Sequence, residues 1–167
     1  MNNPKITKIY LDLDGVICDF HKRYTELFGT LPERDDKSKT FHKNFDTFVE
    51  VRSFATLELM PGAITLIDTL EHLYLEYGIP TEILSSTASQ KRHEAIIEQK
   101  QEWLHNHNII FKQNFVPGKQ LKYKFAEPTA LIIDDTVSVI DDWRRAGGQA
   151  IWHNNVPATL AMLKVWL

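Results

Sequence analysis

Short apolar runs alternate along this chain of 167 residues with longer amphipathic stretches, and this alternation limits the possible folds more than any other feature. The pattern is typical of a parallel β-sheet flanked by helices. The expected strands are residues 6–13, 81–84, 115–116, 130–133 and 149–152, and the expected helices are residues 63–77, 90–107, 137–146 and 157–167. The sequence therefore predicts an α/β fold with a Rossmann-like parallel sheet.

One long interval breaks this rhythm. Residues 20–60 contain a helix candidate, a polar stretch and several phenylalanines, but no strand candidate. So long an interval between two strands predicts an inserted subdomain rather than a simple crossover. We expect residues 1–19 and 80–167 to form the core, and residues 20–79 to form a small helical cap insert with its return helix.

Composition excludes several classes of protein. The single cysteine, Cys18, permits neither an internal disulfide nor a cysteine-rich zinc site. With 22 acidic and 19 basic residues the net charge is -3, so we expect no nucleic-acid partner for the chain as a whole. No apolar run reaches the roughly 18 residues of a membrane span, and no secretory leader is visible. We therefore expect a cytoplasmic protein with no membrane partner and of undetermined oligomeric state.

Two acidic pairs stand at the ends of predicted strands. Asp12 and Asp14 stand at the end of the first strand, and Asp134 and Asp135 follow the fourth. The carboxyl ends of parallel strands meet at one edge of the sheet, so both pairs can converge on a single cation. A ligand set made only of oxygens suits Mg²⁺ better than zinc. A polar turn is the simpler alternative, but it would need only one aspartate and Gly15.

Hydroxyl and ammonium groups complete the candidate site. Ser85 and Ser86 end the second strand, where they can hold a phosphate oxygen or merely cap a helix. Three lysines, at positions 119, 122 and 124, precede the fourth strand. One lysine brought to the site can neutralise a carboxylate and a phosphoryl oxygen together.

The order of these motifs resembles that of the haloacid dehalogenase-like (HAD) phosphohydrolases. The resemblance rests on the segment 12–16 (DLDGV), on Ser85, on a lysine and on the segment 132–135 (IIDD), and it spans nearly the whole chain. Segments 14–20 (DGVICDF) and 57–63 (LELMPGA) are similar to those of 5'(3')-deoxyribonucleotidases and their small phage and bacterial relatives.

The resemblance implies specific catalytic roles. Asp12 would be the nucleophile that forms an aspartyl-phosphate, and Asp14 the general acid and base. Ser85 would bind a phosphoryl oxygen. Spacing in the small phage relatives favours Lys122 as the catalytic lysine, whereas counting as in the nucleotidases favours Lys124. We choose Lys122, with Lys124 and Lys119 as the alternatives.

The same resemblance implies the metal ligands. Mg²⁺ would be held by Asp12, by the main-chain carbonyl of Asp14 and by Asp135, with Asp134 either a ligand or a supporting partner.

The implied activity is Mg²⁺-dependent hydrolysis of small phosphomonoesters, above all (deoxy)nucleoside monophosphates. Ser86 would contact the substrate, and Phe20 and Phe54 would line a nucleobase pocket, although both rings can equally form the core of the insert. Two alternatives stay open: a phosphatase for nucleic-acid ends, and a phosphoacceptor module that does not turn over.

Overall fold

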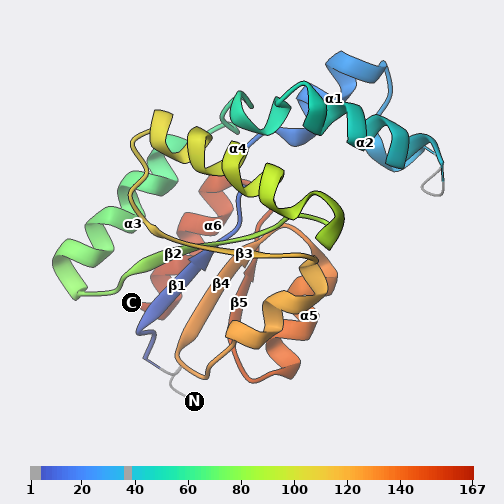
Figure 1. The fold of residues 1–167 in the computed structure, drawn as a ribbon. Helices are drawn as coiled ribbons and strands as arrows, with labels where there is room; N and C mark the ends of the chain where they lie inside the picture. Colours follow the sequence, from blue (N-terminus) through green and yellow to red (C-terminus); the bar gives the residue numbers. More distant parts are fainter. Residues whose placement is uncertain (1–4, 36–38) are drawn as a thin grey trace.

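The computed structural model describes residues 5–35 and 39–167, and its centre is a parallel sheet (Figure 1). Five strands lie in the order β3-β2-β1-β4-β5, and every neighbouring pair is parallel. Their bounds are β1 Lys8–Leu11, β2 Thr81–Ser86, β3 Lys112–Val116, β4 Ala130–Asp134 and β5 Gln149–Trp152. The expected Rossmann-like α/β class, with a helical insert after the first strand, is confirmed.

Helices cover both faces of the sheet. They are α3 (Ala63–Tyr77), α4 (His93–Asn106), α5 (Val137–Arg145) and α6 (Val156–Leu163). Side chains alternate across β1, so Ile9 and Leu11 join the core with α3, α4 and α6, whereas Tyr10 joins a second core with α5. Among the described residues, no helix is both long and apolar enough to cross a membrane.

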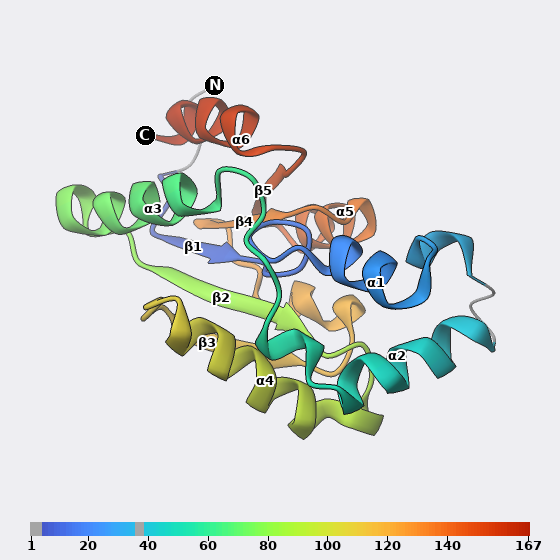
Figure 2. The ribbon, with the colours of Figure 1, turned by 90° about the horizontal axis from the view of Figure 1, so that it is seen from above.

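The described residues of the insert after β1 form two helices and two 3-10 turns. Helix α1 (Phe20–Phe28) and the 3-10 turn η1 (Pro32–Arg34) are followed by α2 (Thr40–Glu50) and the 3-10 turn η2 (Ser53–Ala55). A cluster of aromatic rings forms its interior, with members from both helices and η2: Phe20, Tyr24, Phe41, Phe45, Phe48 and Phe54. The insert lies beyond the carboxyl ends of the strands (Figure 2).

The return helix α3 packs on the sheet rather than on the insert. Its buried residues Leu66 and Leu70 belong to the core shared with β1, and α3 lies beside α6 (Figure 2). The domain division at residues 19 and 79 stays a prediction.

Polar contacts fasten the insert to the core along α4. The Gln99 side-chain amide donates to the carbonyl of Val49 at 2.9 Å and accepts from the N–H of Phe54 at 3.3 Å. Near the start of α4, Arg92 pairs with Asp46 of α2 at 2.8 Å. The insert is therefore held to the core by side-chain contacts along α4, in addition to the two points where the chain enters and leaves it.

Candidate active site

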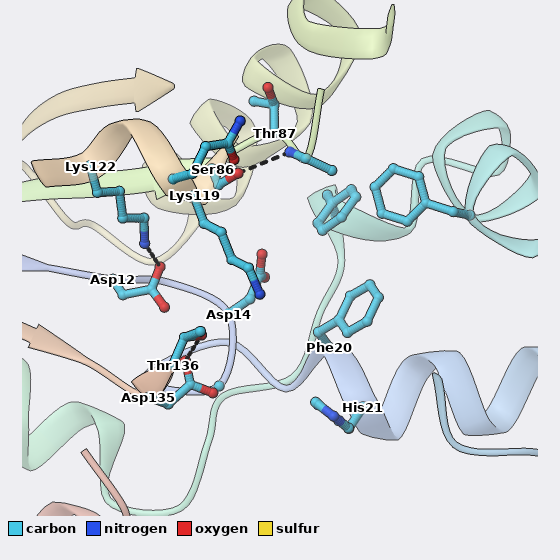
Figure 3. A pocket seen from close by; sticks show the side chains of 15 residues that line it. Asp12, Asp14, Phe20, His21, Ser86, Thr87, Lys119, Lys122, Asp135 and Thr136 are labelled. Atoms are coloured by element: carbon cyan, nitrogen blue, oxygen red, sulfur yellow. Dashed lines mark hydrogen bonds and ion pairs between the residues drawn. The ribbon is translucent and has the colours of Figure 1, made fainter. Parts of the chain in front are cut away.

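A cavity of about 400 Å³ lies between the insert and the carboxyl ends of the strands (Figure 3). Its volume falls in the range of roughly 300–1,000 Å³ typical of small-molecule sites. Polar residues line its floor and aromatic residues of the insert line its other side; together these are Asp12, Asp14, Gly15, Phe20, His21, Phe45, Phe54, Ser86, Thr87, Ala88, Lys119, Gln120, Lys122, Asp135 and Thr136.

Asp12 and Lys122 form a buried ion pair on the cavity floor. The Lys122 ammonium donates to Asp12 Oδ1 at 2.9 Å and to Asp134 Oδ2 at 2.7 Å. Burial raises the pKa of Asp12 well above its usual range, and the nearby Asp134 carboxylate adds to this, while Lys122 opposes it. Burial lowers the pKa of Lys122, but the two carboxylates outweigh burial, so its net shift is upwards and the ammonium stays charged.

A tight loop carries Asp14 into the same cavity. The N–H groups of Val16 and Cys18 both donate to the Leu13 carbonyl, which curls the chain directly after β1. Gly15 has φ +83°, a conformation that favours glycine. A Cβ built on Gly15 would lie 2.0 Å from Asp135 Oδ2, so the loop and the end of β4 touch where only glycine fits.

Three carboxylates converge on one point of this floor. Oxygens of Asp12, Asp134 and Asp135 all lie within 4.8 Å of one another. Burial raises the pKa of Asp135, and the Asp134 carboxylate raises it further. No ion pair in the described part of the chain includes Asp135, so Lys122 alone faces three acidic groups. Such a set of hard oxygen donors fits a divalent cation.

Asp134 differs from the other two carboxylates because both of its oxygens already have donors. Oδ2 accepts from Lys122, and Oδ1 accepts from the N–H of Thr136 at 2.9 Å. Asp134 is fully buried and does not line the cavity, whereas Asp12 and Asp135 do.

The structure separates the two serines at the end of β2. Ser85, expected to bind a phosphoryl oxygen, is fully buried and outside the cavity lining, and its hydroxyl contacts the Lys100 ammonium at 2.7 Å. Ser86, the next residue, lines the cavity, and its Oγ accepts from the N–H of Ala88 at 3.0 Å. Successive side chains of a strand point to opposite sides, so only one of the pair can face a ligand here.

The three candidate lysines occupy different environments. Lys122 is buried beside Asp12, whereas Lys124 is exposed and outside the cavity lining. Lys119 is exposed, and its side chain extends along the cavity (Figure 3). Of the three, only Lys122 contacts a carboxylate of the floor.

Both phenylalanines expected at the substrate line the cavity, but they differ in exposure. Phe54 is only 3% exposed and packs among the rings of the insert, with Phe20 stacked at a centroid distance of 5.9 Å. Phe20 is half-buried, as is Phe45, which the sequence did not single out as a site residue. Phe20 and Phe45 therefore offer more ring surface to a ligand than Phe54.

One charged residue near the site was not anticipated. Lys100 of α4 is buried, and its ammonium contacts Asp14 Oδ2 at 2.8 Å. Its position in the sequence carries a signal, because it lies four residues after buried Ile96 and four before buried Leu104, on the inner face of the helix. A lysine on an apolar face needs an acidic partner.

Comparisons with known proteins support the fold of this chain. No protein-family model matches the chain, and no curated protein matches it. The crystal structure of a hydrolase from Streptococcus pneumoniae TIGR4 is similar, with a TM-score of 0.55 and 15% identity over 96% of this chain and 99% of that one. The HAD domain of the effector protein Lem4 from Legionella pneumophila gives a TM-score of 0.42 and 15% identity over 96% and 93% of the two chains.

Proposed function

We propose that this protein is a Mg²⁺-dependent phosphatase of the HAD type that hydrolyses small phosphomonoesters through an aspartyl-phosphate. The observation that carries the proposal is the placing of Asp12 and Asp14 in one cavity, with the Lys122 ammonium 2.9 Å from Asp12 and Asp135 among the lining residues.

The reaction would proceed in two displacements. An Asp12 oxygen attacks phosphorus, the new P–O bond forms, and the bond to the ester oxygen breaks while Asp14 donates a proton to the departing alkoxide. Asp14 then takes a proton from water, which attacks the phosphorus of the aspartyl-phosphate. Inorganic phosphate leaves and the Asp12 carboxylate is restored.

Mg²⁺ would be held by Asp12, Asp135 and the Asp14 carbonyl. When bound, it supplies positive charge that lets an anionic nucleophile and an anionic phosphate approach each other. Asp134 would act mainly through Lys122, because both of its oxygens already accept hydrogen bonds.

The phosphoryl oxygens would be held by Ser86 and Lys122. Ser86 takes the role that the sequence suggested for Ser85, because its hydroxyl is the one at the cavity. Lys122 keeps the phosphoryl group beside Asp12 and partly neutralises it.

Nucleoside monophosphates are the substrates that the cavity favours. Phe20 and Phe45 of the insert stand opposite the acidic floor, so one molecule can place its phosphate on the floor and a flat ring against them. The base would not stack on Phe54, because that ring is almost wholly covered by other residues.

A substrate panel tests the proposal. Purified protein with Mg²⁺ should release phosphate from one or more of the ribo- and deoxyribonucleoside monophosphates and sugar phosphates, over many turnovers per protein molecule, and Asp12→Asn should abolish release. Unchanged turnover in Asp12→Asn would exclude the mechanism. Much higher efficiency on 5'- or 3'-phosphorylated oligonucleotides would favour an end phosphatase, and a single stoichiometric phosphorylation would favour a phosphoacceptor.

A further inference from the structure

A second buried lysine, Lys100 of α4, contacts the other proposed catalytic aspartate, Asp14. Lys100 is 3% exposed, and its ammonium lies 2.8 Å from Asp14 Oδ2, 2.7 Å from Ser85 Oγ and 2.8 Å from the carbonyl of Ser86. It also stands 5.0 Å from the centre of the Phe54 ring.

These contacts leave Lys100 nothing to offer a substrate. An ammonium carries three protons, and three acceptors in the protein take them. Lys100 also does not line the cavity, whereas Asp14 does. Its effect on a reaction would therefore be exerted through Asp14.

Asp14 depends on this contact for its orientation. Its Oδ1 is buried and has no hydrogen-bond partner in the described part of the chain. Burying an unpaired carboxylate oxygen is costly, so the side chain would turn elsewhere without a strong contact at its other oxygen. The contact that the structure gives to that other oxygen, Oδ2, is the Lys100 ammonium.

Lys100 itself is held by contacts from two elements. Its helix α4 is fastened to the insert through Gln99, the preceding residue, which hydrogen-bonds both Val49 and Phe54. Ser85 fixes the ammonium from the end of β2. The Lys100 ammonium is therefore held in place both from α4 and from the end of β2.

We propose that Lys100 is a positioning residue that holds the Asp14 carboxyl at the cavity for proton transfer to the leaving group. The inference rests on the proposed phosphatase function and assigns the two buried lysines separate tasks. Lys122 serves the attack on phosphorus, which every substrate needs. Lys100 serves protonation, which only a substrate with a poor leaving group needs.

The substrate dependence of Lys100→Met tests this division. Methionine keeps an unbranched buried side chain but removes the charge. We expect kcat/KM to fall about 100-fold on an alkyl phosphate, such as the best nucleoside monophosphate, and less than about 5-fold on p-nitrophenyl phosphate, whose leaving group needs no proton. Asp14→Asn should show the same selective loss, and the double variant should lose little more than either single variant. Lys164→Met, at an exposed lysine, serves as the control.

Ser85→Ala gives a second test that does not bury an unpaired charge. Removing one partner of Lys100 should reduce turnover of the alkyl phosphate several-fold and spare p-nitrophenyl phosphate. An equal loss on both substrates in either folded variant, or additive losses in the double variant, would overturn the proposal. Failure of the unaltered protein to hydrolyse either substrate would instead overturn the phosphatase function itself.

Discussion

Gly15→Ala is the most specific single test of the site geometry. The substitution adds one carbon, and that carbon would meet Asp135 Oδ2 at 2.0 Å. Real contacts of this kind are essentially never shorter than 3.0 Å, so the carboxylate must retreat by about 1 Å or more. Alanine at φ +83° adds backbone strain of roughly 1–2 kcal/mol.

Two effects of different size follow. The strain should lower Tm by roughly 2–8 °C, given about 2–4 °C per kcal/mol for a domain of this size. The displaced carboxylate should lower kcat/KM about 100-fold, the loss expected when a group of the site shifts by about 1 Å. It should also raise the Mg²⁺ concentration needed for half-maximal activity.

Gly78→Ala is the matched control. Gly78 ends α3 with φ +66°, and a Cβ there would meet nothing within 4 Å. The Gly78→Ala variant should therefore have a similar backbone strain energy but no clash at the site. Thermal melts and Mg²⁺ titrations of activity on both variants separate the two effects. If Gly15→Ala matched Gly78→Ala in activity and Mg²⁺ requirement, the placing of Asp135 in the catalytic site would be refuted.

Three further predictions concern charge. Lys122→Ala should destabilise the fold by about 3–5 kcal/mol, because it leaves buried Asp12 and Asp134 unpaired, and it should abolish turnover. Lys124→Ala should do neither. Urea unfolding and phosphate release measure the two effects, and a reversed result would assign the catalytic lysine to position 124. Mg²⁺ should raise Tm at neutral pH by relieving repulsion among the clustered carboxylates, and chelator should reverse this; calorimetry showing no shift would contradict the metal site. Burial, together with a hydrogen bond to a carboxylate, raises the pKa of Tyr24 to about 12. The unfolded chain therefore ionises first as the pH rises, and the free energy of unfolding should fall by roughly 2–3 kcal/mol between about pH 10 and 12. In urea melts Tyr24→Phe should reduce this loss, and an unchanged dependence on pH would contradict the prediction.

The sheet could be predicted from sequence because buried parallel strands are continuous apolar runs. The weakest prediction was β3, which begins at Lys112 rather than at residue 115. This strand lies at the edge of the sheet, so polar residues on it stay partly exposed and hide the apolar signal. The first strand ends at Leu11, earlier than expected, because the chain curls at Leu13 to form the loop that carries Asp14.

The acidic pairs could be placed together from sequence because parallel strands end at one edge. The choice between Ser85 and Ser86 could not be made in this way. A shift of one residue turns a side chain to the other side of a strand, and two adjacent serines give the same letters in either register. The structure places Ser86 at the cavity.

Lys100 was missed for a different reason. Its partners Asp14 and Ser85 lie 86 and 15 residues away along the chain, and the pairing depends on how α4 packs across the sheet end. The helical spacing that could have indicated a buried lysine was present, but that spacing names no partner.

The contacts along α4 have a consequence for how this protein would choose among ligands. Gln99 ties the end of α2 to the core, and Arg92 ties its middle. Because these contacts hold the insert against the core, the opening of the cavity would keep a constant size and would not widen when a ligand enters. The protein would then select its ligands by size. Phosphate esters too bulky for the opening would not bind, even where their phosphate groups fit the site.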